Sequence, residues 1–307
     1  MDIFIQQIIN GLVLGSIYAL VALGYTMVYG IMGLINFAHG EVVMIGAMVA
    51  ITVIKLLGDS GLPGIVIVLI GLGAAAMVCM AVGFSIERIA YRPLRNAPKL
   101  APLITAIGVS IVLQNIAMLV WGRNYHSFPP ILPEAQYEIF GATITALQVA
   151  IVLIAALTMG GLMLLIHRTR LGRAMRATSE NPAIAQLMGV NINQIISFTF
   201  IIGSALAALA GLMVSANNSI AHYNMGFILG LKAFTAAVLG GIGNLAGAML
   251  GGILLGLIES LGAGYIGDLT GGFLGSHYQD VFAFFVLICV LVFRPSGLVG
   301  EKMAERA

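Results

Sequence analysis

The sequence predicts an all-α polytopic membrane protein with about nine transmembrane helices, within a range of eight to ten. The 307 residues are 60% hydrophobic and 8% charged, and their mean hydropathy is +1.05, far above that of soluble domains. The charges lie in short clusters between long uncharged runs. Because no segment outside these runs exceeds about two dozen residues, a soluble core has no room, and we expect a single transmembrane domain over residues 1–307.

The spans follow from the uncharged runs, since about 20 apolar residues cross a bilayer. Residues 3–38 carry no charge and hold one full span and the beginning of the next. No Lys or Arg precedes Lys55, so we expect no cleavable signal peptide. The seventh run is short enough to be re-entrant or broken. The spans after the first are predicted at about 34–57, 64–86, 101–121, 145–166, 192–216, 226–240, 245–264 and 278–293.

Small residues recur at helical spacing in the first span and in the glycine-rich region near the end of the chain. Such residues let helix backbones approach closely in lipid, where packing replaces the hydrophobic effect as the cause of association. We therefore expect tightly crossed helices at three series, which are Gly11 with Gly15, Gly243 with Gly247 and Gly251, and Gly252 with Gly256.

The distribution of positive charge predicts the orientation of the spans. Of the 14 Lys and Arg residues, 11 lie in 87–100, in 167–191 or after Phe293. Nine spans place these segments on one side, which the positive-inside rule identifies as the cytoplasm. We therefore predict cytoplasmic loops at 87–100 and 167–191, an outer loop at 122–144, an outer N-terminus and a cytoplasmic C-terminus.

The second basic loop, 167–191, has the pattern of two short helices. Thr169 is a candidate N-cap of the first helix, and Asn181 followed by Pro182 is typical of the start of the second. Gly189 is placed to end it. We therefore expect this loop to be folded.

The first of these two helices is amphipathic. Leu171, Ala174, Met175 and Thr178 share one face at i, i+3, i+4 and i+7, and arginines occupy the rest of the surface. Such a helix needs a partner, which is either anionic lipid attracted by the arginines or the groove of a cytoplasmic protein that receives the apolar stripe. A simpler alternative is that the arginines only set the topology.

Ionisable groups inside spans are costly and usually face a cavity or a partner. Glu41, Lys232 and Glu259 are the best placed, either along a translocation path or paired with one another to fix helix packing. The same two explanations apply to the amides and the histidine within spans. The candidate path residues are Asn36, His39, Glu41, Gln114, Asn115, Lys232 and Glu259, with Asn217 and Asn218 after the sixth span.

Several activities lack the residues that they need. The sequence has no row of intramembrane Asp, Glu and His for a proton relay and no channel filter. It has no Walker-type glycine loop, H-E-x-x-H or G-x-S-x-G element, so an intramembrane enzyme is not indicated. Because the chain has no room for a soluble domain, any nucleotide hydrolysis must come from another chain. Cys79 and Cys289 lie in apolar runs as small hydrophobes, and we expect neither a disulfide nor a metal site.

Three blocks of the chain resemble the permeases of branched-chain amino-acid ABC importers, and the likeness is greatest to the LivH-type subunit. The blocks span most of the chain in the family's order. They are NGLVLGSIYALVALGYTMVYGIMGLINFAHGEVVMIGAM at 10–48, TRLGRAMRATSENPAIAQLMGVN at 169–191 and GGIGNLAGAMLGGILLGLIE at 240–259.

The resemblance implies an ABC importer permease fold in a bacterial inner membrane, with the N-terminus and 122–144 in the periplasm. It implies translocation of leucine, isoleucine and valine, delivered by a periplasmic binding protein, through this chain and a homologous sister permease. Two cytoplasmic ATPases would bind ATP with magnesium, and this chain would hold no cofactor and no nucleic acid. Relatives that carry urea or short amides are one alternative, and a self-sufficient secondary transporter or channel for a small neutral solute is another.

The resemblance places the family's coupling loop, which docks on the ATPases, at 168–191. The chain departs from the general EAA pattern of ABC importers, because Glu180 is followed by Asn-Pro and only Ala183, Ala185 and Gly189 match it. The coupling residues implied are Arg170, Leu171, Arg173, Ala174, Met175, Arg176, Glu180 and Gly189.

Overall fold

The chain folds into a bundle of membrane-crossing helices, as its computed structural model shows for residues 2–95, 97–98, 100–131, 135–139, 141–271 and 278–300. Among these residues, seven helices are long and apolar enough to cross a membrane, and the shorter α9 and α11 are also apolar. The predicted all-α membrane fold is confirmed. The helices are α1 (Asp2–Met32), α2 (His39–Leu57), α3 (Gly64–Ser85), α4 (Leu100–Trp121), α5 (Ala146–Arg168), α6 (Arg170–Glu180), α7 (Pro182–Leu187), α8 (Ile192–Asn218), α9 (Met225–Gly240), α10 (Leu245–Leu269) and α11 (Gln279–Phe293).

The helix boundaries differ from the predicted ones at three places. The second helix begins at His39 rather than near residue 34, because α1 continues to Met32 and a bend follows. The seventh span, α9, is one continuous helix. The predicted loop 87–100 is helical as far as Leu94, since α3 continues into a π-helical turn, Ile86–Tyr91, and a 3-10 turn. Lys99 of that loop, and Lys302 and Arg306 of the tail, lie outside the described residues.

Contacts between the connecting segments agree with nine crossings. At one end of the bundle, β1 (His126–Ser127) pairs antiparallel with β4 (Ile220–Ala221), and Gln6 at the start of α1 accepts a hydrogen bond of 2.9 Å from the Thr143 N–H. At the other end, the Leu298 N–H donates to the Leu239 carbonyl at 2.9 Å. The start of α1 and the segments that follow α4 and α8 therefore share one end, and the segments that follow α9 and α11 share the other.

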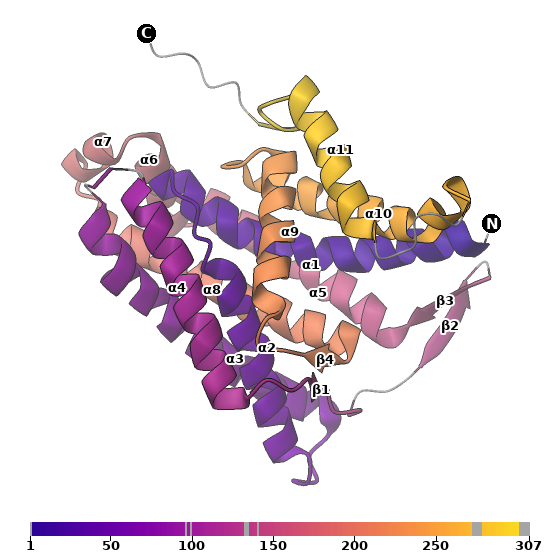
Figure 1. Cartoon of the computed structure of the whole chain (residues 1–307). Helices are drawn as coiled ribbons and strands as arrows, with labels where there is room; N and C mark the ends of the chain where they lie inside the picture. The colour runs from indigo at the N-terminus through magenta and orange to yellow at the C-terminus, as the bar shows by residue number, and fades with distance from the viewer. Residues whose placement is uncertain are drawn as a thin grey trace.

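The helices form a buried centre and an outer layer. α1 and α10 lie side by side across the molecule, and α2, α8 and α9 pack around them (Figure 1). The outer α3, α4, α5 and α11 expose large apolar side chains, such as Leu119, Leu157 and Phe293, over most of their surface. An exposed apolar layer of this kind is stable in lipid rather than in water.

The crossing of α1 and α10 depends on glycine. A Cβ added at Gly11 or Gly15 would come within 3.0 Å of the backbone of α10, and one added at Gly252 or Gly256 would come equally close to the backbone of α1. No side chain fits at such a distance. The close crossing predicted from these two glycine pairs is confirmed.

The third predicted glycine series is right for two of its members. Gly247 and Gly251 in α10 contact the backbone of α9 near Gly240, so they pack as expected. Gly243 lies instead in the turn between α9 and α10, where its φ of +96° is a conformation that favours glycine. Its spacing resembled that of a helix by coincidence.

The predicted outer loop 122–144 takes part in two short strand pairs, which the sequence did not indicate. One is β1 with β4, and the other is the hairpin of β2 (Gln136–Ile139) with β3 (Ala142–Thr145). Thr145 then forms a capping box with Gln148, which begins α5 directly after the hairpin. Residues 132–134 and 140 of this loop lie outside the described residues.

Candidate functional site

Local hydrogen bonds hold α6 and α7 in a defined turn. The Thr169 hydroxyl accepts from the Gly172 N–H at 3.0 Å, and the Asn181 side chain accepts from the Ile184 N–H at 3.1 Å. Gly189 has a φ of +85° and follows the end of α7. The predicted caps are confirmed, and the two helices form one end of the molecule (Figure 1).

The apolar stripe of α6 faces the protein's own core. Met175 and Thr178 are buried, and Leu171 and Ala174 are half-buried. The helix packs against α1, α5 and α8. The hypothesis that this stripe inserts into the groove of a partner is therefore wrong, because its partner lies within the same chain.

The surface left open on these two helices combines cations with a second apolar patch. Arg170, Arg173, Arg176 and Glu180 are exposed on α6. On α7 and the residue after it, three large apolar side chains are exposed at 56%, 87% and 82%, and these are Ile184, Leu187 and Met188. We call these three residues the α7 patch. Sequence reasoning missed it, although the spacing i, i+3 and i+4 puts all three on one face of a helix too short to bury two faces.

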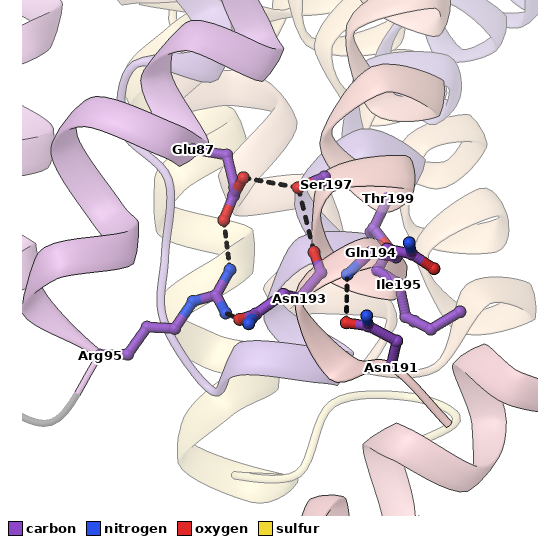
Figure 2. Close-up of polar contacts among 8 residues, drawn as sticks. All are labelled: Glu87, Arg95, Asn191, Asn193, Gln194, Ile195, Ser197 and Thr199. Atoms are coloured by element: carbon purple, nitrogen blue, oxygen red, sulfur yellow. Dashed lines mark hydrogen bonds and ion pairs between the residues drawn. The ribbon is translucent and has the colours of Figure 1, made fainter. Parts of the chain in front are cut away.

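A buried charge cluster ties the end of α3 to the start of α8, as Figure 2 shows. The Glu87 side chain is fully buried and forms an ion pair with the Arg95 guanidinium, which also donates to the Asn193 side chain. The Ser197 hydroxyl donates to the second Glu87 oxygen at 2.7 Å. Burial lowers the pKa of Arg95, and the negative charge of Glu87 acts against this shift. We call these four residues the Glu87 cluster.

The Glu87 cluster includes the start of α8, which is the helix that follows α6 and α7 along the chain. We call α6 and α7 together the α6–α7 turn. Asn191 caps α8 by accepting from the Gln194 N–H at 3.2 Å, and Asn193 belongs to the cluster (Figure 2). The start of α8 is thus bonded to α3 as well as continuous with α7. One signal for the Glu87 cluster was present in the sequence, namely a single glutamate among the arginines that follow the third span.

A second charge cluster lies between four helices inside the bundle. Lys232 on α9 contacts Glu259 on α10 at 2.6 Å and Asp280 on α11 at 2.8 Å. The Tyr18 hydroxyl on α1 donates to the other Glu259 oxygen at 2.9 Å. We call these four residues the Lys232 cluster. Pairing of Lys232 with Glu259 was one of the two explanations left open by the sequence, and Tyr18 and Asp280 were not anticipated.

A cavity of about 440 Å³ adjoins the Lys232 cluster. Lys232, Glu259 and Tyr18 line it on one side, so the pair is both a packing contact and part of a cavity wall. The other lining residues come from α1, α5, α8 and α10, and most are amides, namely Gln7, Asn10, Gln148, Asn217 and Asn218. A polar, partly charged cavity inside a membrane protein is typical of a solute pathway.

Comparison with known proteins gives the family. A family model described as a branched-chain amino acid transport system permease component matches residues 7–291. The chain belongs to this permease family. The permease is 48% identical to the high-affinity branched-chain amino acid transport system permease protein BraD of Pseudomonas aeruginosa, over 99% of this chain and 98% of BraD.

Two further relatives match nearly the whole permease. The LivH permease protein of the high-affinity branched-chain amino acid transport system of Escherichia coli K12 is 44% identical, over 99% of this chain and 97% of LivH. A probable LivH of Methanocaldococcus jannaschii is 29% identical, over 97% of this chain and 94% of that protein. The resemblance seen in the sequence is therefore confirmed at the level of the family.

Three predicted path residues of the permease are buried away from the cavity. Asn36 accepts a 3.0 Å hydrogen bond from the Tyr91 hydroxyl, and His39 packs edge-on against Tyr25 with ring centroids 5.0 Å apart. Glu41 accepts from the Ser110 hydroxyl at 3.2 Å. These contacts join α2 and the segment before it to α1, to α4 and to the π-helical turn that follows α3.

Two other path candidates of the permease lie on α4. Gln114 donates to the side chain of Asn224, which directly precedes α9. Asn115 is exposed and donates to the Ile111 carbonyl of its own helix at 2.8 Å. Of the nine candidates, the structure brings four to the cavity, and these are Lys232, Glu259, Asn217 and Asn218.

Proposed function

We propose that this permease is the membrane-spanning subunit of an ATP-driven importer for leucine, isoleucine and valine. The observation that carries this proposal is the match to BraD over nearly the full length of both chains. The α6–α7 turn adds a structural reason, because a capped, charged hairpin at one end of a bundle suits docking to a soluble protein. We place the permease in a bacterial inner membrane.

The orientation that we propose follows the positive charge. The α6–α7 turn carries four arginines between residues 168 and 176, and so faces the cytoplasm. The end of the bundle with β1 and β4 then faces the periplasm, together with the N-terminus, and the C-terminus is cytoplasmic. Loops 87–100 and 167–191 belong to the cytoplasmic side, and loop 122–144 to the periplasmic side.

We propose partners for the steps of transport that one permease chain does not perform, which are ATP hydrolysis, completion of the pathway and delivery of the amino acid. Two cytoplasmic ATPase subunits bind ATP with magnesium and hydrolyse it, and this chain holds no cofactor and binds no nucleic acid. A second permease subunit, a homologous sister chain, completes the pathway within the membrane lipid. A periplasmic binding protein delivers the amino acid.

For coupling, we propose that the α7 patch inserts into the ATPase while the arginines of α6 fix its position. Leu187 and Met188 are the most exposed apolar side chains of the turn, and apolar anchors surrounded by charge are typical of docking surfaces. ATP binding moves the turn, and the Glu87 cluster carries this movement from α8 to α3 because it bonds the two helices together. The buried Met175 and the half-buried Leu171 hold α6 on the bundle and act indirectly.

For delivery, we propose that the binding protein contacts the surface formed by β1 and β4. Three aromatic rings gather there, with Tyr125 stacked on His222 at 4.5 Å and His222 against Tyr223 at 4.3 Å between centroids. Tyr125 is 69% exposed. Exposed aromatic rings of this kind are frequent at protein interfaces.

The test is affinity purification of the tagged permease from its native membrane. We expect ATPase chains to accompany the wild type and to be lost, by at least about tenfold, from Leu187→Asp. The matched control is Leu62→Asp, which adds the same charge to an exposed leucine in the turn between α2 and α3 at the other end of the bundle. Uptake in ATP-free vesicles by the chain alone would overturn the proposal and favour a self-sufficient transporter.

A further inference from the structure

The cavity beside the Lys232 cluster has a charged side, an amide side and an apolar side. We infer that it binds a zwitterionic α-amino acid, with the ligand's ammonium at the Lys232 cluster and its carboxylate at the amides of Asn10 and Asn218. The inference rests on the proposed function and adds the place where this chain itself holds its substrate during transport.

The charged side has one cation for two anions. Lys232 contacts Glu259 at 2.6 Å and Asp280 at 2.8 Å, so the three ionised groups carry a net charge of −1. The Asp280 side chain is 39% exposed, so this surplus negative charge is partly solvated, and it still attracts a nearby cation. A ligand ammonium supplies the missing cation, and a carboxylate accepts up to about four hydrogen bonds, so Glu259 has room for one more donor.

The amide side has donors left over. The Asn10 side-chain oxygen accepts from Gln6 at 3.3 Å and from Gln148 at 3.4 Å, and the Asn218 oxygen accepts from Asn217 at 3.2 Å. Within the described part of the chain, the NH2 groups of Asn10 and Asn218 donate to no partner. Unpartnered amide N–H groups beside a cavity suit a carboxylate. Asn218 is exposed and Asn10 is half-buried, so both donors are accessible to a solute in the cavity.

The apolar side suits a hydrocarbon side chain of moderate size. Val13, Leu14 and Ala263 line the cavity between the two polar sides, and its volume of about 440 Å³ falls within the range of small-molecule sites. The specific contacts are all to the ammonium and carboxylate. The cavity therefore recognises the part that all α-amino acids share, and side-chain selectivity resides outside it.

The position of the cavity places it early on an inward route. Gln7 lines it, and the preceding residue, Gln6, is bonded to Thr143 of the β2–β3 hairpin. This hairpin belongs to the proposed periplasmic end. A solute released at that end meets the cavity before it reaches the α6–α7 end of the bundle.

Binding is tested directly on the assembled transporter in lipid nanodiscs, without the binding protein. The probes are L-leucine, 4-methylpentanoate, which lacks the ammonium, and 3-methylbutylamine, which lacks the carboxylate, each observed by saturation-transfer NMR. We expect leucine to bind about tenfold more tightly than either analogue, since each analogue leaves one polar side of the cavity unsatisfied. Equal affinity for leucine and one of the analogues would overturn the inference.

Variants separate binding from packing. Asn218→Leu leaves the Lys232 cluster intact, and we expect it to weaken leucine binding by about tenfold without lowering the Tm. Glu259→Gln tests the charged side in the same assay, scored per folded complex. Thr158→Val, which removes a hydroxyl bonded only to its own helix in α5, is the control and should bind leucine like the wild type. Normal leucine binding by Asn218→Leu would refute the inference.

Transport distinguishes a failure of the inference from a failure of the proposed function. The complete complex, with ATPases, sister permease and leucine-loaded binding protein, is assayed in proteoliposomes for leucine uptake per ATP hydrolysed. We expect Asn218→Leu to lower this ratio by about tenfold. Absence of ATP-dependent uptake by the wild type would refute the proposed function, whereas wild-type uptake with an unchanged ratio in Asn218→Leu would refute the inference alone.

Discussion

The Glu87 cluster, beside the α6–α7 end of the permease, and the Lys232 cluster, between four helices inside the bundle, have the same bonding pattern. In each, a buried glutamate receives one cation and one hydroxyl from other elements, Arg95 and Ser197 in the first and Lys232 and Tyr18 in the second. They differ in what surrounds the glutamate. The Glu87 cluster is closed by the amide of Asn193, whereas the Lys232 cluster has a surplus carboxylate and borders a cavity.

This difference shows that a buried ion pair alone does not indicate a function. A buried pair contributes little net stability, because desolvation offsets its Coulomb energy, but breaking it is strongly unfavourable. The Glu87 cluster therefore has a structural role, which is to fix the end of α3 to α8. The Lys232 cluster fixes four helices too, and its excess charge and adjoining cavity give it a second role toward a ligand.

The largest expected effect is on folding, when the Glu87 cluster loses its anion. Glu87→Ala leaves the half-buried Arg95 guanidinium without a counter-charge and the Ser197 hydroxyl without its acceptor, and we expect a combined loss of about 3–5 kcal/mol in the free energy of unfolding. The measurement is the thermal unfolding of the purified complex in detergent. The control is the double variant Glu87→Leu with Arg95→Met, which should recover most of that loss. A single variant as stable as the wild type would show that the ion pair does not form in the membrane.

An effect of intermediate size on stability is expected when each cluster loses its hydroxyl group, and leucine binding then distinguishes the two clusters. Ser197→Ala and Tyr18→Phe each remove one hydrogen bond to a buried carboxylate, which is about 1.5–3 kcal/mol of stability. We expect both variants to melt earlier, but only Tyr18→Phe to weaken leucine binding. Leucine titrations on both variants measure this, and the same loss of affinity in Ser197→Ala would mean that the clusters do not have separate roles.

The smallest expected effect comes from the surplus carboxylate. The Asp280 side chain is 39% exposed, so Asp280→Asn should change stability by less than about 1 kcal/mol. We expect leucine affinity to fall severalfold, because the net negative charge that favours the ammonium is lost. Asn193→Ala is the counterpart in the Glu87 cluster and should leave leucine affinity unchanged. Unaltered leucine affinity in Asp280→Asn would assign Lys232 and its partners to packing alone.

The sequence predicted those features that are determined by residues close together in the chain. The nine spans, the caps at Thr169 and Asn181 and the end at Gly189 agree with the structure because each follows from hydropathy or from a bond within three or four residues. The wrong predictions concern contacts between residues that lie far apart in the chain. A cytoplasmic protein was one of the partners considered for the apolar stripe of α6. The sequence could not exclude it, because amphipathicity shows that a face is buried but not what buries it.

The candidate site was predictable only in part. An ionisable residue within an apolar run stands out, which identified Lys232 and Glu259, but the run gives only its depth and not the direction in which it points. Asp280 was overlooked because it lies at the start of a span, where charges are ordinary. The α7 patch was overlooked because three apolar residues in a polar loop resemble the start of a core rather than an exposed surface.

By itself, the sequence determined that this protein crosses the membrane about nine times, which ends of its spans are basic and where the helices of the loop 167–191 begin and end. Lipid cannot hydrogen-bond the backbone, so each span must satisfy its own backbone groups and is written locally in the chain. Only the tertiary structure decided which polar residues meet. Tyr18 and Glu259 are 241 positions apart and share a hydrogen bond, because glycines let α1 and α10 approach closely enough to bring them together.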